Sequence, residues 1–154
     1  MKQIALFFTV FLTSFVVYSQ THIYKGNSTS YFDCLYTISE NKVFRGSSTS
    51  YFDCEYTVSG GKVYRGNSTS FSDCLFTIKD NKIYKGNSTN YSDCLYTLKD
   101  GKVYLGNSFS FSDIVLTVRE TKIYNGNSTS YSSCIATLEE SQDLALIAVL
   151  FGPY

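Results

Sequence analysis

Cysteines recur at a fixed spacing in this sequence and are the first candidates for metal or redox chemistry. They are Cys34, Cys54, Cys74, Cys94 and Cys134. If successive positions lie on alternate strands of one sheet, about 2 × 4.8 Å separates them. A disulfide needs Cα atoms about 4.4–6.8 Å apart, and a shared zinc ion needs sulfurs closer still. The pattern therefore predicts buried free thiols that pack as small hydrophobic groups, and Ile114 in the same position agrees with this.

An aspartate precedes most of these positions and raises the question of a calcium site. The row consists of Asp33, Asp53, Asp73, Asp93 and Asp113, with Ser133 in the last unit. Calcium needs clustered oxygen ligands, and the same strand spacing keeps neighbouring carboxylates apart. We expect each aspartate instead to accept hydrogen bonds from the Gly-Asn-Ser-Thr-Ser segment before it. The sequence therefore predicts no metal ion and no other cofactor.

Catalytic groups are scarce, and aromatic residues are better candidates for function. His22 is the single histidine, and no Ser-His-Asp or Cys-His set can be built around it. We therefore expect a protein that is not an enzyme. A row of aromatic positions, expected to be exposed, could stack on sugars or anchor a partner. Alternatively, these rings are ordinary cross-strand partners of threonine. The row is Tyr24, Phe44, Tyr64, Tyr84, Tyr104 and Tyr124.

All these residues belong to a twenty-residue repeat that occurs six times without a gap. The units are 22–41, 42–61, 62–81, 82–101, 102–121 and 122–141. Each unit has a Gly-Asn-Ser-Thr-Ser type of turn, whose invariant glycine favours positive φ. A second turn, such as Gly60-Gly61 or Asp100-Gly101, favours a tight two-residue hairpin. The β-branched and aromatic runs between the turns predict two strands in each unit and twelve in all.

Alternation along these strands assigns their faces. The two-residue turn pairs Ile38 with Val43, and alternation places the Cys34 position on the same face. The cysteine position never takes a charge, whereas the Leu35 position accepts Glu55 in the second unit. A carboxylate is rarely buried without a partner. We therefore expect the face with cysteine, tyrosine and isoleucine to point inward, and the face with leucine, threonine and tyrosine to be at least partly wet.

A closed ring is the arrangement that best suits these hairpins. An isolated hairpin is marginally stable, and an open row leaves two unpaired edges. A barrel of twelve strands removes the edges but has a wide interior. The apolar run at 144–151 can fill it as a helix over 141–151, with Ser141 as candidate N-cap and Gly152-Pro153 as stop. A thirteenth strand and a membrane-seeking tail are the alternatives. The predicted fold class is all-β with one C-terminal helix, in which the six repeats close into a radial, barrel-like structure around it.

The N-terminus indicates export. Lys2 precedes an apolar stretch at 4–17, and Ser19 ends a plausible cleavage site, so 1–19 is predicted to be a secretory signal peptide. The alternative is an uncleaved anchor. The remaining domain would be 20–154, and no cysteine lies at the cleavage site, so a lipid anchor is not expected. The 13 basic and 13 acidic residues cancel, which gives no support to nucleic-acid binding.

The pattern Ile-Tyr-x-Gly-Asn-Ser-Thr-Ser, followed by aspartate and Leu-Tyr-Thr, resembles the bacterial beta-flower proteins, which carry a 4-fold beta flower domain. The resemblance covers Ile23 to Leu138. In that family short hairpins radiate as petals around an apolar centre, and the shape is similar to the tubby barrel with its central helix. The resemblance implies a secreted or surface-associated protein with no established activity. This chain departs from it in having six units where the family name implies four.

These observations leave three functional hypotheses. The first is an exported, non-enzymatic β-repeat scaffold or binding module with an unknown partner, such as another surface protein. The second is a carrier or sensor of a lipid or other hydrophobic ligand, which the likeness to tubby implies. The third is a glycan-binding repeat similar to the aromatic hairpins of choline-binding proteins, although those depend on tryptophan and this chain has none.

Overall fold

The computed structural model describes residues 19–153, so the predicted signal peptide lies outside the described residues except for Ser19. The described chain forms twelve strands, six short 3₁₀ helices and one α-helix. The strands are β1 (Gln20–Lys25), β2 (Cys34–Ser39), β3 (Lys42–Arg45), β4 (Cys54–Ser59), β5 (Lys62–Arg65), β6 (Cys74–Lys79), β7 (Lys82–Lys85), β8 (Cys94–Lys99), β9 (Lys102–Leu105), β10 (Ile114–Arg119), β11 (Lys122–Asn125) and β12 (Cys134–Leu138). The 3₁₀ helices are η1 (Tyr31–Asp33), η2 (Tyr51–Asp53), η3 (Phe71–Asp73), η4 (Tyr91–Asp93), η5 (Phe111–Asp113) and η6 (Tyr131–Ser133), and the α-helix is α1 (Leu144–Phe151).

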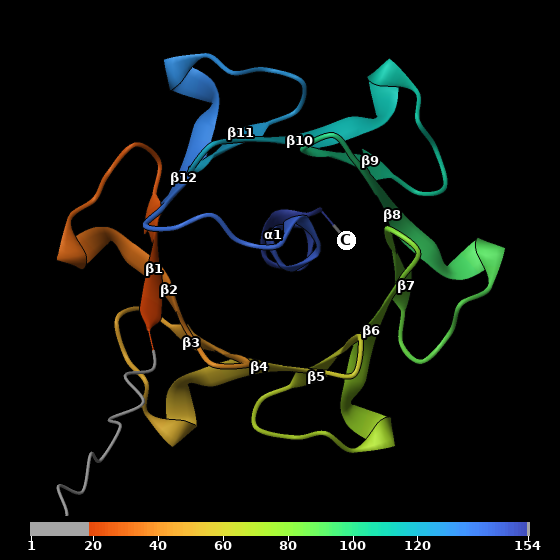
Figure 1. Cartoon of the computed structure of the whole chain (residues 1–154), viewed down its shortest axis with the longest axis horizontal. Helices are drawn as coiled ribbons and strands as arrows, with labels where there is room; N and C mark the ends of the chain where they lie inside the picture. Colours follow the sequence, from red (N-terminus) through yellow and green to blue (C-terminus); the bar gives the residue numbers. More distant parts are fainter. Residues whose placement is uncertain (1–18, 154) are drawn as a thin grey trace, which may run out of the picture.

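The strands form a closed antiparallel barrel, in which each strand pairs with its neighbours in the chain. The ring closes where β1 pairs with β12, with Ile23 opposite Leu138 and Tyr24 opposite Thr137. Figure 1 shows α1 inside this ring and six loops that project outward from it. The sequence-based expectation of twelve strands closed around a C-terminal helix is therefore confirmed. A closed ring satisfies the backbone hydrogen bonds that an open sheet would leave free at its edges.

Two kinds of connection alternate around the ring. Two-residue turns join β2 to β3 and its equivalents, with Ile38 opposite Val43 as predicted. Their first residues have positive φ, for example 55° at Glu40 and 50° at Asp100, which matches tight hairpins between twisted strands. The other connections are the outward loops, each ending in a 3₁₀ helix, and we call them petals. Petals 1 to 6 are residues 26–33, 46–53, 66–73, 86–93, 106–113 and 126–133.

A β-bulge beside each petal reverses two of the expected faces. Ile23 pairs with Tyr36, but Tyr24 pairs with Cys34, so Leu35 is an extra residue in β2. The extra residue packs against the hydrophobic core, and the sulfur of Cys34 lies 3.9 Å from the Thr37 hydroxyl on the outer side of the sheet. The expectation that the cysteine position points inward and the leucine position outward is wrong. One extra residue shifts the alternation of side chains by one position. The side chains on the N-terminal side of the bulge therefore point to the face opposite to the one that strict alternation predicts.

The side chains on the outer face of the barrel are also less exposed to solvent than expected. Thr37 is 0% exposed, and the equivalent threonines of the other units are buried as well. The petals lie over this face, because each threonine hydroxyl donates to the carbonyl of the glycine that starts a petal, as in the 2.7 Å bond from Thr37 Oγ1 to the Gly46 oxygen. The barrel wall is therefore covered on both sides, by the core within and by the bases of the petals outside.

Helix α1 is shorter than the predicted helix at 141–151. It begins at Leu144, and the N-cap is Asp143 rather than Ser141, because the Asp143 carboxylate accepts a 2.8 Å hydrogen bond from the Ala145 amide. Ile147 is 0% exposed within the hydrophobic core. This segment is therefore neither a thirteenth strand nor a tail outside the barrel. In the part of the chain from 19 to 153, no helix has the length and apolar character needed to cross a membrane.

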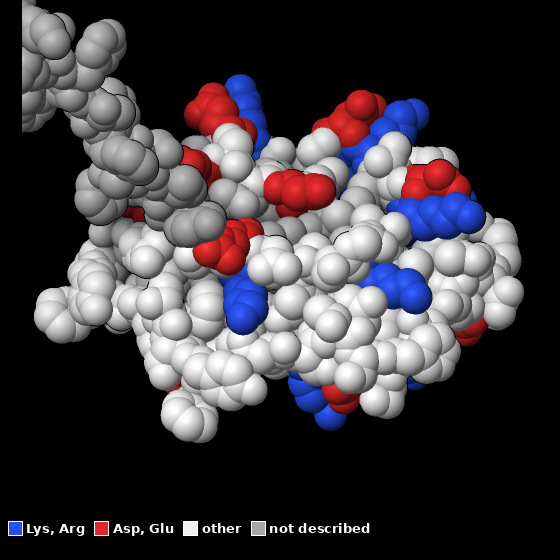
Figure 2. Space-filling model, turned by 60° about the horizontal axis from the view of Figure 1, so that its bottom comes forward, with Lys and Arg blue, Asp and Glu red and all other residues white. Residues whose placement is uncertain are grey.

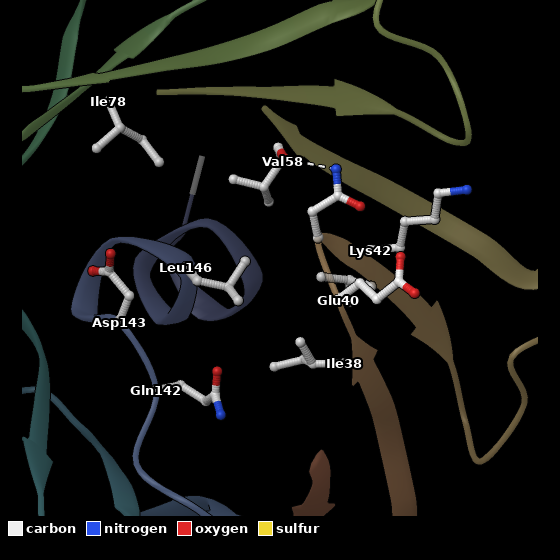
Figure 3. A pocket seen from close by; sticks show the side chains of 10 residues that line it. Ile38, Glu40, Lys42, Val58, Ile78, Gln142, Asp143 and Leu146 are labelled. Atoms are coloured by element: carbon white, nitrogen blue, oxygen red, sulfur yellow. Dashed lines mark hydrogen bonds between the residues drawn. The ribbon is translucent and has the colours of Figure 1, made fainter. Parts of the chain in front are cut away.

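The interior differs from unit to unit around α1, whose backbone comes nearest to β8, β9 and β10. One interior position holds Tyr36, Tyr56, Phe76, Tyr96, Leu116 and Ala136 in successive units. At the C-terminal end of α1, the Phe151 ring packs edge-on to Tyr36 at 6.0 Å, and the Tyr96 hydroxyl donates to the Pro153 carbonyl at 2.6 Å. At the other end, a hollow of about 250 Å³ remains between Leu146 and strands β2 to β6 (Figure 3).

Candidate functional site

The petals carry most of the repeated polar residues, and similar hydrogen bonds recur from petal to petal. In petal 1, the Ser28 hydroxyl donates to the Asp33 carboxylate at 2.6 Å and accepts from the Ser30 amide at 3.0 Å. The glycine at the start has φ of 58°, and its amide donates to the Ile135 carbonyl at 2.8 Å. These bonds hold a short, rigid loop whose 3₁₀ helix begins directly after Ser30.

The aspartate row has the role that the sequence predicts. Asp33, Asp53, Asp73, Asp93 and Asp113 each accept a hydrogen bond from the serine five residues earlier, at 2.5–2.6 Å. In petal 6, Ser133 replaces the carboxylate and contacts Ser130 at 2.8 Å between hydroxyl oxygens. The aspartates therefore brace individual loops. Within the described residues, no group of three or more histidine, cysteine or acidic side chains is placed to hold a metal ion.

The five cysteines are free thiols, as expected, but they lie at the bases of the petals rather than toward the axis. Cys74 donates to the carbonyl of Phe76 and to that of Gly86, both at 3.5 Å. Burial raises the pKa of the Cys34 thiol, while hydrogen bonds from neighbouring groups act in the opposite direction. The five thiols act as small packing groups.

Neighbouring petals are linked to each other through asparagine. The Asn87 amide donates to the Phe71 carbonyl of the preceding petal at 2.8 Å, and its oxygen accepts from Lys62 Nζ at 2.8 Å. The same arrangement crosses the closure of the ring, where Asn27 donates to the Tyr131 carbonyl at 3.0 Å and accepts from Lys122 at 2.7 Å. Asn67 likewise donates to the Tyr51 carbonyl at 2.7 Å, so asparagine anchors the 3₁₀ helices of petals 2, 3 and 6 to the following petal. Petal 2 itself has Ser47 at this position. We call the six petals together the collar.

The predicted row of exposed aromatic residues is not exposed. Phe44, Tyr84 and Tyr104 are 6–9% exposed, and Tyr24, Tyr64 and Tyr124 are half-buried. Each ring faces the outer side of the wall, where a threonine lies opposite it on an adjacent strand, as Thr37 of β2 lies opposite Phe44 of β3. The alternative interpretation, an ordinary cross-strand aromatic–threonine pair, describes this contact better.

The exposed rings form a different set, which the sequence analysis did not single out. They are the first residues of the 3₁₀ helices, and they are 66–79% exposed: Tyr31, Tyr51, Phe71, Tyr91, Phe111 and Tyr131. A signal for them exists in the sequence, because this position accepts only tyrosine or phenylalanine although it follows a polar loop. Rings held at that position without burial are typical of an interaction surface.

Petals 1 and 2 differ from the other four in carrying an aromatic residue directly after the first ring, whereas the additional ring of petal 5 is Phe109, earlier in the loop. Phe32 is 95% exposed and Phe52 is 92% exposed, where the remaining petals have serine. Each packs edge-on against the tyrosine before it, with ring centroids 6.2 Å apart in petal 1 and 5.8 Å apart in petal 2. The collar therefore has one sector, formed by adjacent petals, in which four exposed rings are concentrated.

His22, the only histidine, is part of the seam that closes the barrel. Its Nδ1 lies 2.7 Å from a carboxylate oxygen of Glu139, which also accepts from the His22 amide at 3.0 Å. The hydrogen bonds from His22 lower the pKa of the Glu139 carboxyl. This histidine therefore has a structural partner where β1 meets β12.

The charges on the surface are interleaved. Figure 2 shows acidic and basic side chains next to each other along one edge of the molecule, above a flank that is mostly uncharged. Some lysines lie over petal rings, as Lys62 Nζ does at 6.0 Å from the centre of Phe71 and Lys122 Nζ at 6.0 Å from that of Tyr131. The petals therefore expose mainly aromatic rings, together with the hydroxyl and amide groups that surround them.

A closed ring of repeated hairpins with rigid outward loops defines a β-repeat scaffold. A family model described as "6-fold beta flower protein" matches residues 12–108 and 97–142. The chain therefore belongs to the 6-fold beta flower family. The expected 4-fold domain is corrected to a six-fold one, in agreement with the count of six units, and the likeness to the tubby barrel stays a hypothesis. No curated protein and no solved structure matches the chain.

Proposed function

We propose that this protein is an exported, non-enzymatic binding module whose petals bind a surface glycan. The observation that carries the proposal is the exposed aromatic ring at the head of each petal, on a loop held in place by Ser–Asp and Gly–Thr hydrogen bonds. A ring that is already fixed loses little conformational freedom on binding. Export is supported by the charged, apolar and small-residue pattern of the first nineteen residues.

The composition of the petals supports recognition by this surface. They consist mainly of glycine, asparagine, serine, threonine and tyrosine, which is the composition that antibody loops use for binding. There, tyrosine supplies rigid contact area, and serine and asparagine supply adaptable hydrogen bonds. A sugar ring offers an apolar face bordered by hydroxyl groups, so it can stack on a phenol or phenyl ring while the loop hydroxyls and amides bind its edge.

The sixfold arrangement favours a ligand that itself repeats. Identical weak sites on one rigid body reinforce each other when the ligand can reach several of them at once. A polysaccharide has that property, and the neutral net charge of the chain suits an uncharged polymer. Petals 1 and 2 would bind most strongly, because Phe32 and Phe52 add two nearly fully exposed rings to this sector.

The proposal is tested by measuring binding to a glycan array and to insoluble polysaccharides, first with the wild-type chain and then with the variant Phe32→Ser/Phe52→Ser. Serine already stands at this position in petals 3 to 6, so we expect the variant to fold normally. Removing two contact rings should weaken binding by about tenfold or more. Phe44→Tyr is the matched control, since Phe44 is buried and tyrosine occupies its place in other units. Failure of the wild-type chain to bind any glycan, or equal binding by the double variant, would contradict the proposal.

A further inference from the structure

Two adjoining hollows lie at the end of the barrel where the petals begin. The larger, of about 470 Å³, borders β4, β5 and β6, and the smaller, of about 310 Å³, borders β6, β7 and β8. Both are lined by Leu75 and Phe76, so they form one groove that runs across successive units. We call it the rim groove. Their sizes are within the range of about 300–1,000 Å³ that small-molecule sites occupy.

The floor of the rim groove is apolar because of the β-bulges. Leu75 and Leu95 are the extra residues of β6 and β8, and the bulge turns them toward the core side, against which they pack partly buried. Phe76 lies beside them and is 6% exposed. The backbone of α1 comes nearer to β8, β9 and β10 than to β4, β5 and β6, and the hollow between β6 and β8 is lined by the apolar side chains of Leu75, Phe76 and Leu95.

The border of the rim groove is cationic. Arg65 and Lys85 line its two parts and are exposed, and each is paired in register with an aromatic residue of the interior, Tyr56 and Phe76 respectively. Between residues 19 and 153, neither of these cations forms a salt bridge. Arg45 at the near end differs, because its guanidinium bonds the Glu55 carboxylate at 2.5 Å, which raises the pKa of the arginine.

A basic residue occupies this position in units 1 to 4, but not in units 5 and 6. The same position holds Leu105 in unit 5 and Asn125 in unit 6. The repeat therefore does not need a basic residue here to fold. An apolar floor with two unneutralised cations at its border is complementary to a molecule that has a hydrocarbon chain and one anionic end.

We propose that the rim groove binds a single-chain anionic amphiphile of the fatty-acid class. Its chain would lie on Leu75, Phe76 and Leu95, and its carboxylate would pair with Arg65 and Lys85. The guanidinium of arginine suits a carboxylate because it can donate two parallel hydrogen bonds. The rim groove is separate from the exposed rings of the petals, so this inference goes beyond the proposed glycan binding and either can fail without the other.

Titration calorimetry of the whole chain with sodium laurate, below the micelle concentration, tests this inference. We expect saturable binding of laurate and binding of dodecanol, which lacks the charge, that is on the order of tenfold weaker. Vesicles of anionic phospholipid form a third arm. Binding of such vesicles without binding of free laurate would overturn the proposal in favour of a membrane surface, and absence of binding in all arms would overturn it outright.

Variants taken from the repeat itself locate the site. Arg65→Asn/Lys85→Asn, which copies Asn125, should remove the preference for laurate over dodecanol. Leu75→Glu, which copies Glu55 of the second unit, should abolish laurate binding by placing a carboxylate in the floor. Lys25→Asn is the matched control, because Lys25 has the same position in the first unit but does not line the groove. Unchanged laurate binding in the double variant, or an equal loss in Lys25→Asn, would overturn the assignment.

Discussion

The bases of the petals are alike in all six units, whereas the interior of the barrel differs from unit to unit. The same contact holds the base of every petal, a threonine hydroxyl that donates to the glycine carbonyl at 2.6–2.8 Å in all six units. The interior changes from unit to unit, from tyrosine through leucine to alanine at one position. A petal contacts its own hairpin and its neighbours, whereas the interior residues of all six units belong to one core that also contains a helix without sixfold symmetry. Local contacts therefore preserve the repeat, and the shared core breaks it.

The largest expected effect comes from disrupting the interior at its centre. Ile147→Asp would place an unpaired carboxylate at a side chain that is 0% exposed, which costs several kcal/mol and is comparable to the whole stability of a domain. We expect loss of the folded state by circular dichroism. Leu146→Asp is the control, since Leu146 borders the hollow of Figure 3 and is half-buried, and this variant should remain folded with a lower melting temperature. Equal melting of Ile147→Asp and wild type would show that α1 does not fill the barrel.

A second change exchanges side chains between units of the interior. Ala136→Tyr introduces the residue of units 1, 2 and 4 at a site that is 0% exposed. Overpacking of this kind costs about 1–3 kcal/mol. Tyr56→Phe, which copies Phe76, should cost less than about 1.5 kcal/mol in urea unfolding. If Ala136→Tyr and Tyr56→Phe lower the free energy of unfolding equally, side chains of the interior could be exchanged between units. The proposed difference between the interior and the petals would then be wrong.

A smaller effect is expected when one petal bond is removed. Thr97→Val deletes the 2.8 Å hydrogen bond to the Gly106 carbonyl with little change of shape, and should cost about 1 kcal/mol. Thr37→Val removes the equivalent bond to Gly46. We expect the two values from urea unfolding to agree within about 0.5 kcal/mol, because the petals are built alike. A clear difference would mean that the contribution of this hydrogen bond to stability depends on the position of the petal in the ring.

The smallest effect concerns the seam, which has no equivalent elsewhere in the ring. The pKa of Glu139 is lowered from 4.5 by its hydrogen bonds with His22. A carboxyl whose folded pKa lies below its unfolded pKa stabilises the fold above the unfolded value, and this contribution is lost as the pH falls through the folded pKa. Glu139→Gln should therefore cost at most about 1 kcal/mol at pH 7 and nothing well below pH 4.5.

Thermal melting from pH 7 down to pH 3 measures the effect of Glu139→Gln. The exposed neighbour Glu140 gives the control variant Glu140→Gln. A pH dependence of stability that is the same in Glu139→Gln and in wild type would rule out this contribution of the seam.

The repeat, the turns, the strand count and the roles of the aspartates were predictable because each depends on residues close together in the chain. The Ser28–Asp33 bond spans five residues, and the turn that pairs Ile38 with Val43 is equally local. Faces were predicted correctly up to the bulge and incorrectly beyond it. A strictly alternating pattern does not reveal one extra residue. The cysteines were therefore predicted on the inner face and the leucines on the outer face, whereas the structure shows the reverse. The exposed rings of the petals were missed for a different reason: the tyrosine row within the strands does face outward, as predicted, but the petals lie over it.

The sequence by itself determined the number of units, the closed β-architecture and a buried apolar C-terminal helix, because periodicity and side-chain polarity encode these directly. Only the tertiary structure decided which face each side chain occupies, where α1 lies inside the ring, and which aromatic rings remain in solvent. The bulges depend on pairing between strands, and the position of the helix depends on the combined volumes of side chains from all six units. These are long-range packing effects, which no window along a single chain contains.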